Sequence, residues 1–429
     1  MIKKITNNPL FKSSLIYTVS DGINKSVPFF ILPVLSHYLL PSDYGVVANF
    51  GVLLGIATLL ISLSIEGVVS VNYHKFTKHQ IGTLIFNAAL ISFLSFSILI
   101  VATLIFSDYI YKFVEIPLEY QLLCILMAFI NLFTSLNLVL WRLEEKPINF
   151  GLYDISNTVI NITFSLIFII LLGQKWEGRI NGMAIAMISY GLFSFGFLIK
   201  RKYLVFNFDK NYIKEALLFG IPLLPHALSF WIRSGIDRVF ITKIWGSDEV
   251  GLYATGFQFG LLVSFLVMAF NNAFSPYLYK TLSISDPNKL NEEKLKIVKI
   301  TYMIMVGLLV SGIIFIIFSK IIIVNLFSEK YFQAISYVNW AIISQVFNGF
   351  YVLFVNYIFY VKKTKELATI TISCSLIQII LSYFLIKSLG PIGGAYSTVI
   401  ISILTFISVM VYSMKIYKMP WTYILNKQL

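Results

Sequence analysis

Two stretches of the sequence, PSDYGVVANFGVLLG (residues 41–55) and GSDEVGLYATGFQFGLL (residues 246–262), repeat one pattern in the two halves of the 429-residue chain. Two small residues occupy equivalent places in both stretches, at an offset of 206 positions: Gly45 with Gly251, and Ala48 with Ala254. Because this offset is nearly half the length of the chain, the pattern predicts an internal duplication.

The ends of the two halves also resemble each other. INGMAIAMISY begins at Ile180, and IGGAYSTVIIS begins at Ile392. We therefore expect two lobes of the same design, residues 1–206 and 207–429, joined by the basic connection around residues 200–215.

The composition indicates a membrane protein. The chain is 58% hydrophobic and 12% charged, with a mean hydropathy of +0.82, whereas soluble domains carry about 25% charged residues. Apolar segments long enough to cross a hydrocarbon core of about 30 Å recur from end to end. Since lipid offers the backbone no hydrogen-bond partners, these segments must be helices. Twelve spans are expected: residues 13–38, 44–70, 81–106, 120–141, 149–172, 181–199, 216–241, 250–274, 297–319, 334–360, 367–386 and 392–414.

Each half contains six of these spans, so the chain returns to its starting side between the halves. The predicted fold is therefore all-α and polytopic, with twelve transmembrane helices arranged as two six-helix lobes. The lobes form a parallel repeat around a central cavity. Transporters built from such repeats place their substrate site near the bilayer midplane, beside interrupted helices.

The distribution of Lys and Arg sets the expected orientation. Of the 33 such residues, 23 lie in segments on the side of the N-terminus and 7 on the opposite side, and Lys25, Arg233 and Arg238 lie within spans. This asymmetry predicts cytoplasmic termini. It also accounts for the net charge of +13 without a nucleic-acid partner. Charged residues interrupt the first apolar run, so we expect a retained span there rather than a cleaved signal.

Charged residues inside the spans are the candidate functional residues. SFWIRSGIDRVFI (residues 229–241) contains three of them, and the full set is Asp21, Lys25, Glu66, Arg233, Asp237 and Arg238. Six charges facing lipid would cost on the order of 15–20 kcal/mol, more than the usual net stability of about 5–15 kcal/mol. They must therefore face protein or a hydrated cavity.

Two interpretations of these charges remain open. In one, Asp21 pairs with Lys25, and Arg233 pairs with Asp237, at favourable i,i+4 spacing. In the other, three cations line the cavity and bind an anionic cargo: Lys25, Arg233 and Arg238. Asp237 then orients Arg233, and the acidic residues support the cations. Glu66 and Asp154 lie nearer to helix ends, where a structural role is expected.

Matched proline pairs mark the first span of each half. Pro28 and Pro33 lie in one, and Pro222 and Pro225 lie in the other. A proline inside a helix removes a hydrogen bond and bends the helix. The pairs are hinge candidates, and packing kinks are the alternative. The dispersed histidines and the two cysteines within spans, Cys124 and Cys374, predict no metal site and no disulfide.

The quoted patterns also carry a family resemblance. LSHYLLPSDYGVVANF (residues 35–50) and DRVFITKIWGSDEVGLYATGFQFG (residues 237–260) resemble the polysaccharide-exporter branch of the multidrug/oligosaccharidyl-lipid/polysaccharide superfamily. More closely, the chain resembles bacterial O-antigen flippases of the Wzx type over its whole length. The family's charged lumen residues in the first and seventh helices fall here on Lys25, Arg233 and Arg238.

The resemblance implies a multi-pass protein of the bacterial cytoplasmic (inner) membrane that is not an enzyme and needs no cofactor. Its cargo would be an undecaprenyl-pyrophosphate-linked oligosaccharide, moved across the membrane by alternating access for O-antigen, lipopolysaccharide or similar surface polysaccharide biosynthesis. The coupling ion, H⁺ or Na⁺, is left open. Besides membrane lipid, the implied partners are the polysaccharide polymerase and the chain-length machinery.

Two alternative functions remain. O-antigen polymerases and ligases are also polytopic, but they carry a long periplasmic loop, and the longest outer connections here, residues 107–119 and 320–333, have about a dozen residues each. A drug/cation antiporter of the same superfamily would favour an acidic cavity, whereas cations lie inside the spans here.

Overall fold

The computed structural model describes residues 9–421, except for the side chains of residues 9–15, 18, 19, 21, 25 and 28. Within this range the chain forms helices and no strand. It packs into two compact units. Unit 1 contains the described residues up to Trp231 and Trp245–Gly251, and unit 2 contains Ile232–Ile244 and the described residues from Leu252. The lobe boundary predicted near residue 206 stays a prediction.

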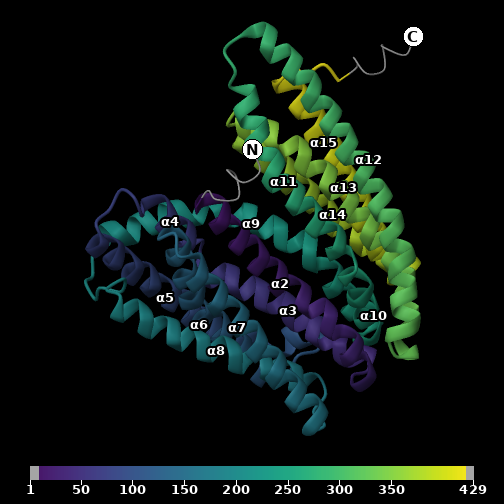
Figure 1. Cartoon of the computed structure of the whole chain (residues 1–429). Coiled ribbons are helices and arrows are strands. Elements are labelled where there is room, and N and C mark those ends of the chain that lie inside the picture. The colour runs from purple at the N-terminus through teal and green to yellow at the C-terminus, as the bar shows by residue number, and fades with distance from the viewer. Residues whose placement is uncertain (1–8, 422–429) are drawn as a thin grey trace. The chain divides into compact units, whose positions relative to one another are not determined.

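In unit 1, α6 is the central helix, and α3, α5 and α8 pack around it. A second contact joins α2 to α7, where Ile31 and Leu35 pack with Ile162. Figure 1 shows these helices in purple to blue. The helices are α2 (Pro9–Tyr38), α3 (Pro41–Ser62), α4 (Ile65–Asn72), α5 (Lys78–Val114), α6 (Leu118–Leu143), α7 (Pro147–Leu166) with the π-helix η1 (Ile167–Leu171), α8 (Trp176–Lys200) and the first part of α9 (Lys210–Trp245).

In unit 2, α13 is the central helix, and α15, α11 and α12 pack against it. Helix α14 lies beside α15, as Figure 1 shows in green and yellow. The elements are the later part of α9, α10 (Ser247–Gln258), α11 (Gly260–Leu282), α12 (Pro287–Leu326), the 3₁₀ helix η2 (Glu329–Ala334), α13 (Ile335–Tyr360), α14 (Thr364–Leu389) and α15 (Ile392–Ile416).

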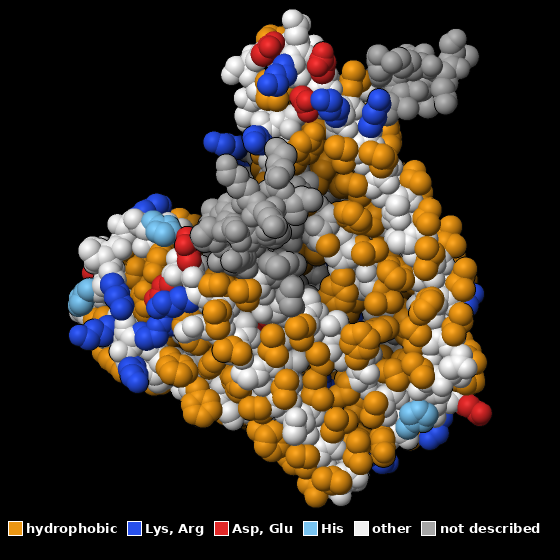
Figure 2. Space-filling model, viewed as in Figure 1, with side chains coloured by type: hydrophobic (Ala, Val, Ile, Leu, Met, Phe, Trp, Pro, Cys, Tyr) orange, Lys and Arg blue, Asp and Glu red, His pale blue; other side chains and the backbone are white. Residues whose placement is uncertain are grey.

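The expected membrane spans are present. Eleven segments within the described residues are long and apolar enough to cross a membrane, and α2, with 30 residues, occupies the position of the first predicted span. The chain is therefore a multi-pass helical membrane protein. In Figure 2, apolar side chains cover the long sides of the helices, while Lys and Arg gather around α4 in unit 1 and around the α11–α12 connection in unit 2.

We expect cysteine labelling to verify the predicted orientation. Lys112→Cys and Lys330→Cys should react with a membrane-impermeant thiol reagent added to intact cells, because both positions are exposed at ends opposite the basic connections. Lys75→Cys and Ser285→Cys, which are also exposed, should react only after the membrane is permeabilised. The native cysteines, Cys124 and Cys374, are buried and give a low background. The reverse labelling pattern would contradict the orientation.

Local sequence signals explain where several helices begin. Thr77 caps α5 and forms a reciprocal capping box with Gln80. The carboxylate of Asp286 accepts hydrogen bonds from the first backbone N–H groups of α12, which starts at Pro287. These signals place the start of α5 three residues, and the start of α12 ten residues, before the predicted spans.

The second predicted span, residues 44–70, is broken in the structure. Leu63 and Ser64 both adopt left-handed backbone conformations, with φ of 45° and 58°, and α3 ends before them. The hydroxyl of Ser92 donates to the Ile61 carbonyl at 2.7 Å, which satisfies a backbone acceptor near the break. The backbone of Gly220 on α9 lies so close that an added Cβ would be 2.3 Å from the Leu63 carbonyl oxygen.

The repeated glycines of the opening motif are where two helix starts touch, both within unit 1. A Cβ added to Gly45 would be 1.9 Å from the Ser247 carbonyl oxygen, and one added to Gly251 would be 1.8 Å from the Pro41 carbonyl oxygen. The offset that relates Gly45 to Gly251 also relates Pro41 to Ser247. The contact is therefore reciprocal, as expected between two copies of one motif, and it leaves no room for a side chain.

A polar network joins the connections at the other end of unit 1. The Glu144 carboxylate accepts a hydrogen bond from the Tyr203 hydroxyl at 2.7 Å and pairs with Arg201 at 2.6 Å and Lys146 at 2.9 Å. The guanidinium of Arg201 also donates to Asn137 at 2.6 Å. Burial is the largest influence and by itself raises the pKa of this carboxyl group, but hydrogen bonds from Tyr203, Arg201 and Lys146 outweigh it and hold the pKa below its usual value.

This network makes a prediction about acid stability. A depressed carboxyl pKa stabilises the fold at pH values above the unfolded value of about 4.3, and this stabilisation is lost as the pH falls through the folded pKa. We expect Glu144→Gln to lower the free energy of unfolding at pH 7 by on the order of 2 kcal/mol. The difference from wild type should shrink below about pH 4.3. Thermal unfolding of purified protein across this pH range measures it.

Glu366→Gln is the matched control, because Glu366 pairs with Lys363 at 3.4 Å on an exposed surface. It should change stability little, since exposed ion pairs contribute little. Equal effects of the two substitutions would contradict the role assigned to the Glu144 network.

Candidate functional site

The predicted charges of the seventh span lie on α9, within the part that belongs to unit 2. Asp237 is buried, and Arg233 and Arg238 are half-buried. The structure thus keeps all three charges at least partly away from the surface. Their surroundings differ, and that difference decides what each can do.

Asp237 is the centre of a polar cluster built by four helices. Its carboxylate accepts hydrogen bonds from Thr398 at 2.6 Å, from Tyr253 at 3.1 Å, and from Ser382. Longer contacts come from Ser397 at 3.3 Å and Gln378 at 3.4 Å. The partners lie on α10, α14 and α15, so this one carboxylate joins three helices to α9.

The sequence motif IGGAYSTVIIS explains how α15 approaches this carboxylate. A Cβ added to Gly394 would be 3.4 Å from the Asp237 Cβ, so a small residue keeps the two helices close. The following turn then directs Ser397 and Thr398 at the acid.

The i,i+4 ion pair between Arg233 and Asp237 does not form. The four ion pairs among the described residues include neither residue. Hydroxyl groups surround the Asp237 carboxylate instead, and Gln378 also donates to the Arg233 carbonyl oxygen at 3.4 Å. The neutral side chains of Tyr351 and Cys374 lie near the Arg233 guanidinium. The described residues thus show no direct contact through which Asp237 would orient Arg233, and the role of Asp237 as a supporting charge stays a prediction.

Arg238 also lacks an acidic partner among these ion pairs. Its Nε is a buried donor without a hydrogen-bond acceptor among the described residues. Its backbone carbonyl accepts a hydrogen bond from Thr242 at 2.8 Å. Arg233 and Arg238 are thus two cations inside unit 2 that no carboxylate of a described residue neutralises by direct contact.

The candidates on α2 lie partly outside the described residues. The side chains of Asp21, Lys25 and Pro28 are not described, so the pairing of Asp21 with Lys25 and the cavity role of Lys25 stay predictions. Pro33 is half-buried, and Pro222 and Pro225 are exposed on α9. Both helices run on through their prolines, and the hinge role also stays a prediction.

The acidic residues expected near helix ends have local partners. Glu66 lies in the first turn of α4, beside Ser135 of α6. The Asp154 carboxylate on α7 accepts a hydrogen bond from Asn24 on α2. Both contacts join neighbouring helices of unit 1.

Sequence reasoning missed one membrane-embedded cation, Arg179. The predicted span began at residue 181, which placed Arg179 in a connection, but α8 begins at Trp176. The Arg179 guanidinium donates to Asn161 at 2.5 Å and to Ser165 at 2.7 Å, both on α7. The late start assigned to the span hid this residue.

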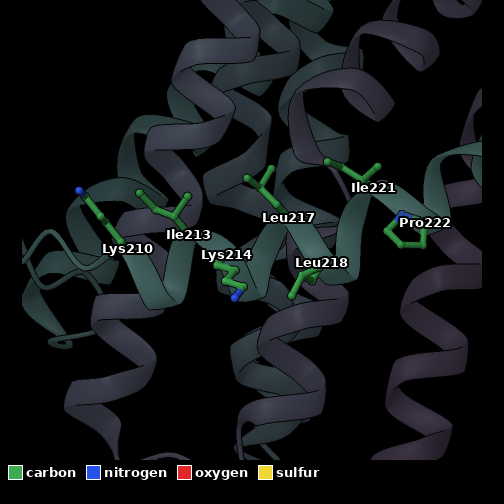
Figure 3. Close-up of a pocket in the computed structure, with 7 residues that line it drawn as sticks. All are labelled: Lys210, Ile213, Lys214, Leu217, Leu218, Ile221 and Pro222. Carbon is green, nitrogen blue, oxygen red and sulfur yellow. The ribbon is translucent and has the colours of Figure 1, made fainter.

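An apolar groove follows the first part of α9, near the basic connection. Its volume is about 370 Å³, and Figure 3 shows Ile213, Leu217 and Ile221 along one side of the helix, with Lys214 and Leu218 on another. The groove is lined by Lys210, Ile213, Lys214, Leu217, Leu218, Ile221 and Pro222. Apolar walls with lysines at one end suit an acyl chain and its headgroup.

Of these features, the Asp237 cluster has the donor set of a cation site. One carboxylate with four hydroxyl groups around it suits a proton or a hard monovalent cation better than a soft transition metal. Groups of three or more His, Cys, Asp or Glu that could hold a metal are absent from the described residues.

Comparison with known proteins places these features in a family. A family model described as "Polysaccharide biosynthesis protein" matches residues 10–282, and the MatE family model matches residues 222–384. The chain is 25% identical to "Lsg locus putative protein 1" of Haemophilus influenzae, over 93% of this chain and 98% of the relative. It is also 25% identical to "Capsular polysaccharide biosynthesis protein CapF" of Staphylococcus aureus, over 65% of this chain and 67% of the relative.

A solved structure shares the fold. It is the inward-facing conformation of a multidrug resistance MATE family transporter of the MOP superfamily, with a TM-score of 0.76 and 18% identity, covering 91% of this chain and 94% of that one. The two-part helical architecture, the sequence relatives and the family match over more than half of the chain agree. The chain belongs to the polysaccharide biosynthesis protein family, the polysaccharide-exporter branch of the multidrug/oligosaccharidyl-lipid/polysaccharide superfamily.

Proposed function

We propose that the protein is a flippase that moves undecaprenyl-pyrophosphate-linked oligosaccharide units, of O-antigen or a similar surface polysaccharide, across the bacterial cytoplasmic membrane by alternating access. The observation that carries this proposal is the pair of cations inside unit 2, Arg233 and Arg238, which belong to no ion pair of the described residues. Uncompensated cations within spans favour an anionic cargo. Membership of a polysaccharide biosynthesis family supports a sugar-containing cargo, and a lipid-linked diphosphate would supply its negative charge.

A deletion strain tests this function. Surface polysaccharide should disappear, and lipid-linked repeat units should accumulate in the cytoplasmic leaflet. A polymerase predicts instead that single units still reach the outer side without elongation. A drug/cation antiporter predicts normal surface polysaccharide and increased sensitivity to toxic cations. Either of these results would remove the flippase proposal.

The Asp237 cluster supports a second part of the proposal, which is that it binds the coupling ion, H⁺ or Na⁺. A buried carboxylate that four helices share changes its hydrogen bonds when it gains a proton or a cation, because the hydroxyls that donate to it must turn to accept. Binding of the ion would thereby alter the packing of α9 against α14 and α15. This is the differential interaction that a coupled transition requires.

We expect Asp237→Asn to remove ion coupling while the protein stays folded, because an amide keeps the shape and part of the hydrogen bonding. Flipping measured in proteoliposomes should respond to an H⁺ or Na⁺ gradient in wild type and not in this variant. Thr398→Val should weaken the response, since Thr398 contacts the carboxylate. Thr405→Val is the control, because the Thr405 hydroxyl donates to the Ile401 carbonyl and has no contact with the Asp237 carboxylate among the described residues. An Asp237→Asn protein that responds as wild type would contradict this assignment.

A further inference from the structure

The Arg179 guanidinium is fixed inside the transmembrane part of unit 1. Its Nη1 donates to Asn161 at 2.5 Å and to Ser165 at 2.7 Å. The helices that carry these residues pack closely, since a Cβ added to Gly182 on α8 would be 2.4 Å from the Ser165 backbone nitrogen. Asn161 and Ser165 lie ten and six residues before the end of η1 at Leu171, so the guanidinium lies roughly 9–15 Å along the helix from that end.

Among the described residues, no carboxylate forms an ion pair with this cation. The ion pairs of the described residues do not include Arg179, and the phenol of Tyr44 lies near its guanidinium. The adjacent Asp43 accepts the Leu40 N–H at 2.9 Å in its own helix cap. The backbone of Asp21 lies near Gly151 on α7, because Gly151 packs against the neighbouring Ser20. Gly151 precedes Asn161 by ten residues, which is roughly 15 Å along the helix.

The contacts of Arg179 leave donors open. A guanidinium has five N–H groups, and only Nη1 is bonded within the described chain. Asn161 uses its amide oxygen, while its Nδ2 makes no hydrogen bond to a described residue. Neither these nitrogens nor Nε and Nη2 of Arg179 are among the enclosed polar atoms that lack a partner. Both residues are half-buried, so part of each side chain is accessible to a ligand.

A guanidinium that is held in place, has unused N–H donors and has no carboxylate partner among the described residues is suited to bind phosphate. Guanidinium groups bind phosphate oxygens through parallel, charge-assisted hydrogen bonds. In an apolar segment, an unpaired cation is costly unless an anion or water meets it. The neutral acceptors Asn161 and Ser165 hold its geometry without cancelling its charge.

We propose that Arg179 and Asn161 form a binding position for a phosphate group carried by a lipid, on α7 and α8 towards the ends joined by residues 172–175. This deepens the proposed function, because under that function the bound group would be the diphosphate of the prenyl carrier near the end of its passage. The same chemistry would accept the headgroup of an anionic phospholipid, and the experiment separates the two sources.

The probe is farnesyl diphosphate, and its binding is measured to full-length protein in phosphatidylcholine nanodiscs, with and without phosphatidylglycerol. Arg179→Gln should weaken binding at least about tenfold, as expected for loss of a charge-assisted contact. Arg179→Lys should weaken it less. Arg142→Gln is the control, since Arg142 is an exposed cation at the opposite end of unit 1. Competition by phosphatidylglycerol would identify a headgroup as the occupant, and its absence would identify the prenyl diphosphate.

Asn161→Asp keeps the proposal testable if Arg179→Gln destabilises the fold. This variant supplies the missing carboxylate beside Arg179, so thermal stability should be kept while farnesyl diphosphate binding falls at least about tenfold. Unchanged binding in both Arg179→Gln and Asn161→Asp would overturn the proposal, even if wild-type protein flips its cargo. Arg179-dependent binding by a protein that does not flip lipid-linked sugar would instead overturn only the proposed function.

Discussion

Gly45→Ala should abolish most folded protein, whereas Gly51→Ala on the same helix should not. The added methyl group at Gly45 would lie 1.9 Å from the Ser247 carbonyl oxygen, while the methyl group at Gly51 would meet nothing within 4 Å. Overpacking against a side chain costs about 1–3 kcal/mol, and here backbone would have to move. In open helix, the same substitution stabilises by roughly 0.5–1 kcal/mol. The two variants should therefore have effects of opposite sign on thermal unfolding and membrane abundance.

The reciprocal contact between α3 and α10 extends this prediction to a second glycine. Gly251→Ala should be as harmful as Gly45→Ala, because its methyl group would lie 1.8 Å from the Pro41 carbonyl oxygen. The double variant should cost less than the sum, since both substitutions open the same contact. Similar thermal stabilities for Gly45→Ala and Gly51→Ala would show that α3 and α10 do not touch in this way.

Arg233→Ala and Lys25→Ala should abolish export at normal protein level. Arg233 belongs to no ion pair of the described residues, so its loss leaves no carboxylate stranded and should spare the fold. A charge-assisted contact contributes about 1.5–3 kcal/mol, so each loss should slow export roughly ten- to hundredfold. Lys25→Arg should retain much of the activity, because it keeps the charge. The measurement is restored surface polysaccharide in a deletion strain, with membrane abundance by immunoblot.

Lys320→Ala is the control, since Lys320 is an exposed cation on α12. If Arg233→Ala and Lys25→Ala both export normally, or fail only because the protein disappears, these cations have a structural role and the anionic-cargo mechanism is wrong.

The fold could be predicted from sequence because hydropathy and the internal repeat are properties of consecutive residues. Each predicted span coincides with one helix or with a pair of consecutive helical segments. The break at Leu63 and Ser64 was not predicted, because the few polar residues around it, such as Ser62 and Glu66, lie within a run that is otherwise apolar and long enough for one span. Its cause is tertiary, since Ser92 and Gly220 accommodate it from other helices.

The candidate site was harder to predict because its contacts, too, join residues that are far apart in the sequence. Sequence spacing revealed the helical neighbour of Asp237 at Arg233, but its actual partners, Ser382 and Thr398, lie more than 140 residues away. Single hydroxyl residues in apolar helices give no signal of the carboxylate that they contact. Arg179 was missed because a cation near the end of an apolar segment can equally be assigned to the adjoining loop.

Reconstitution tests the central claim most directly. Purified protein is placed in proteoliposomes that contain a prenyl-diphosphate-linked oligosaccharide, and a membrane-impermeant sugar-modifying enzyme is added outside. If the protein flips the cargo, the enzyme should modify the lipid-linked sugar of both leaflets in wild-type vesicles, but only the outer pool in Arg233→Ala vesicles. Modification of the outer pool alone by vesicles that carry folded wild-type protein, with or without an H⁺ or Na⁺ gradient, would contradict the flippase account.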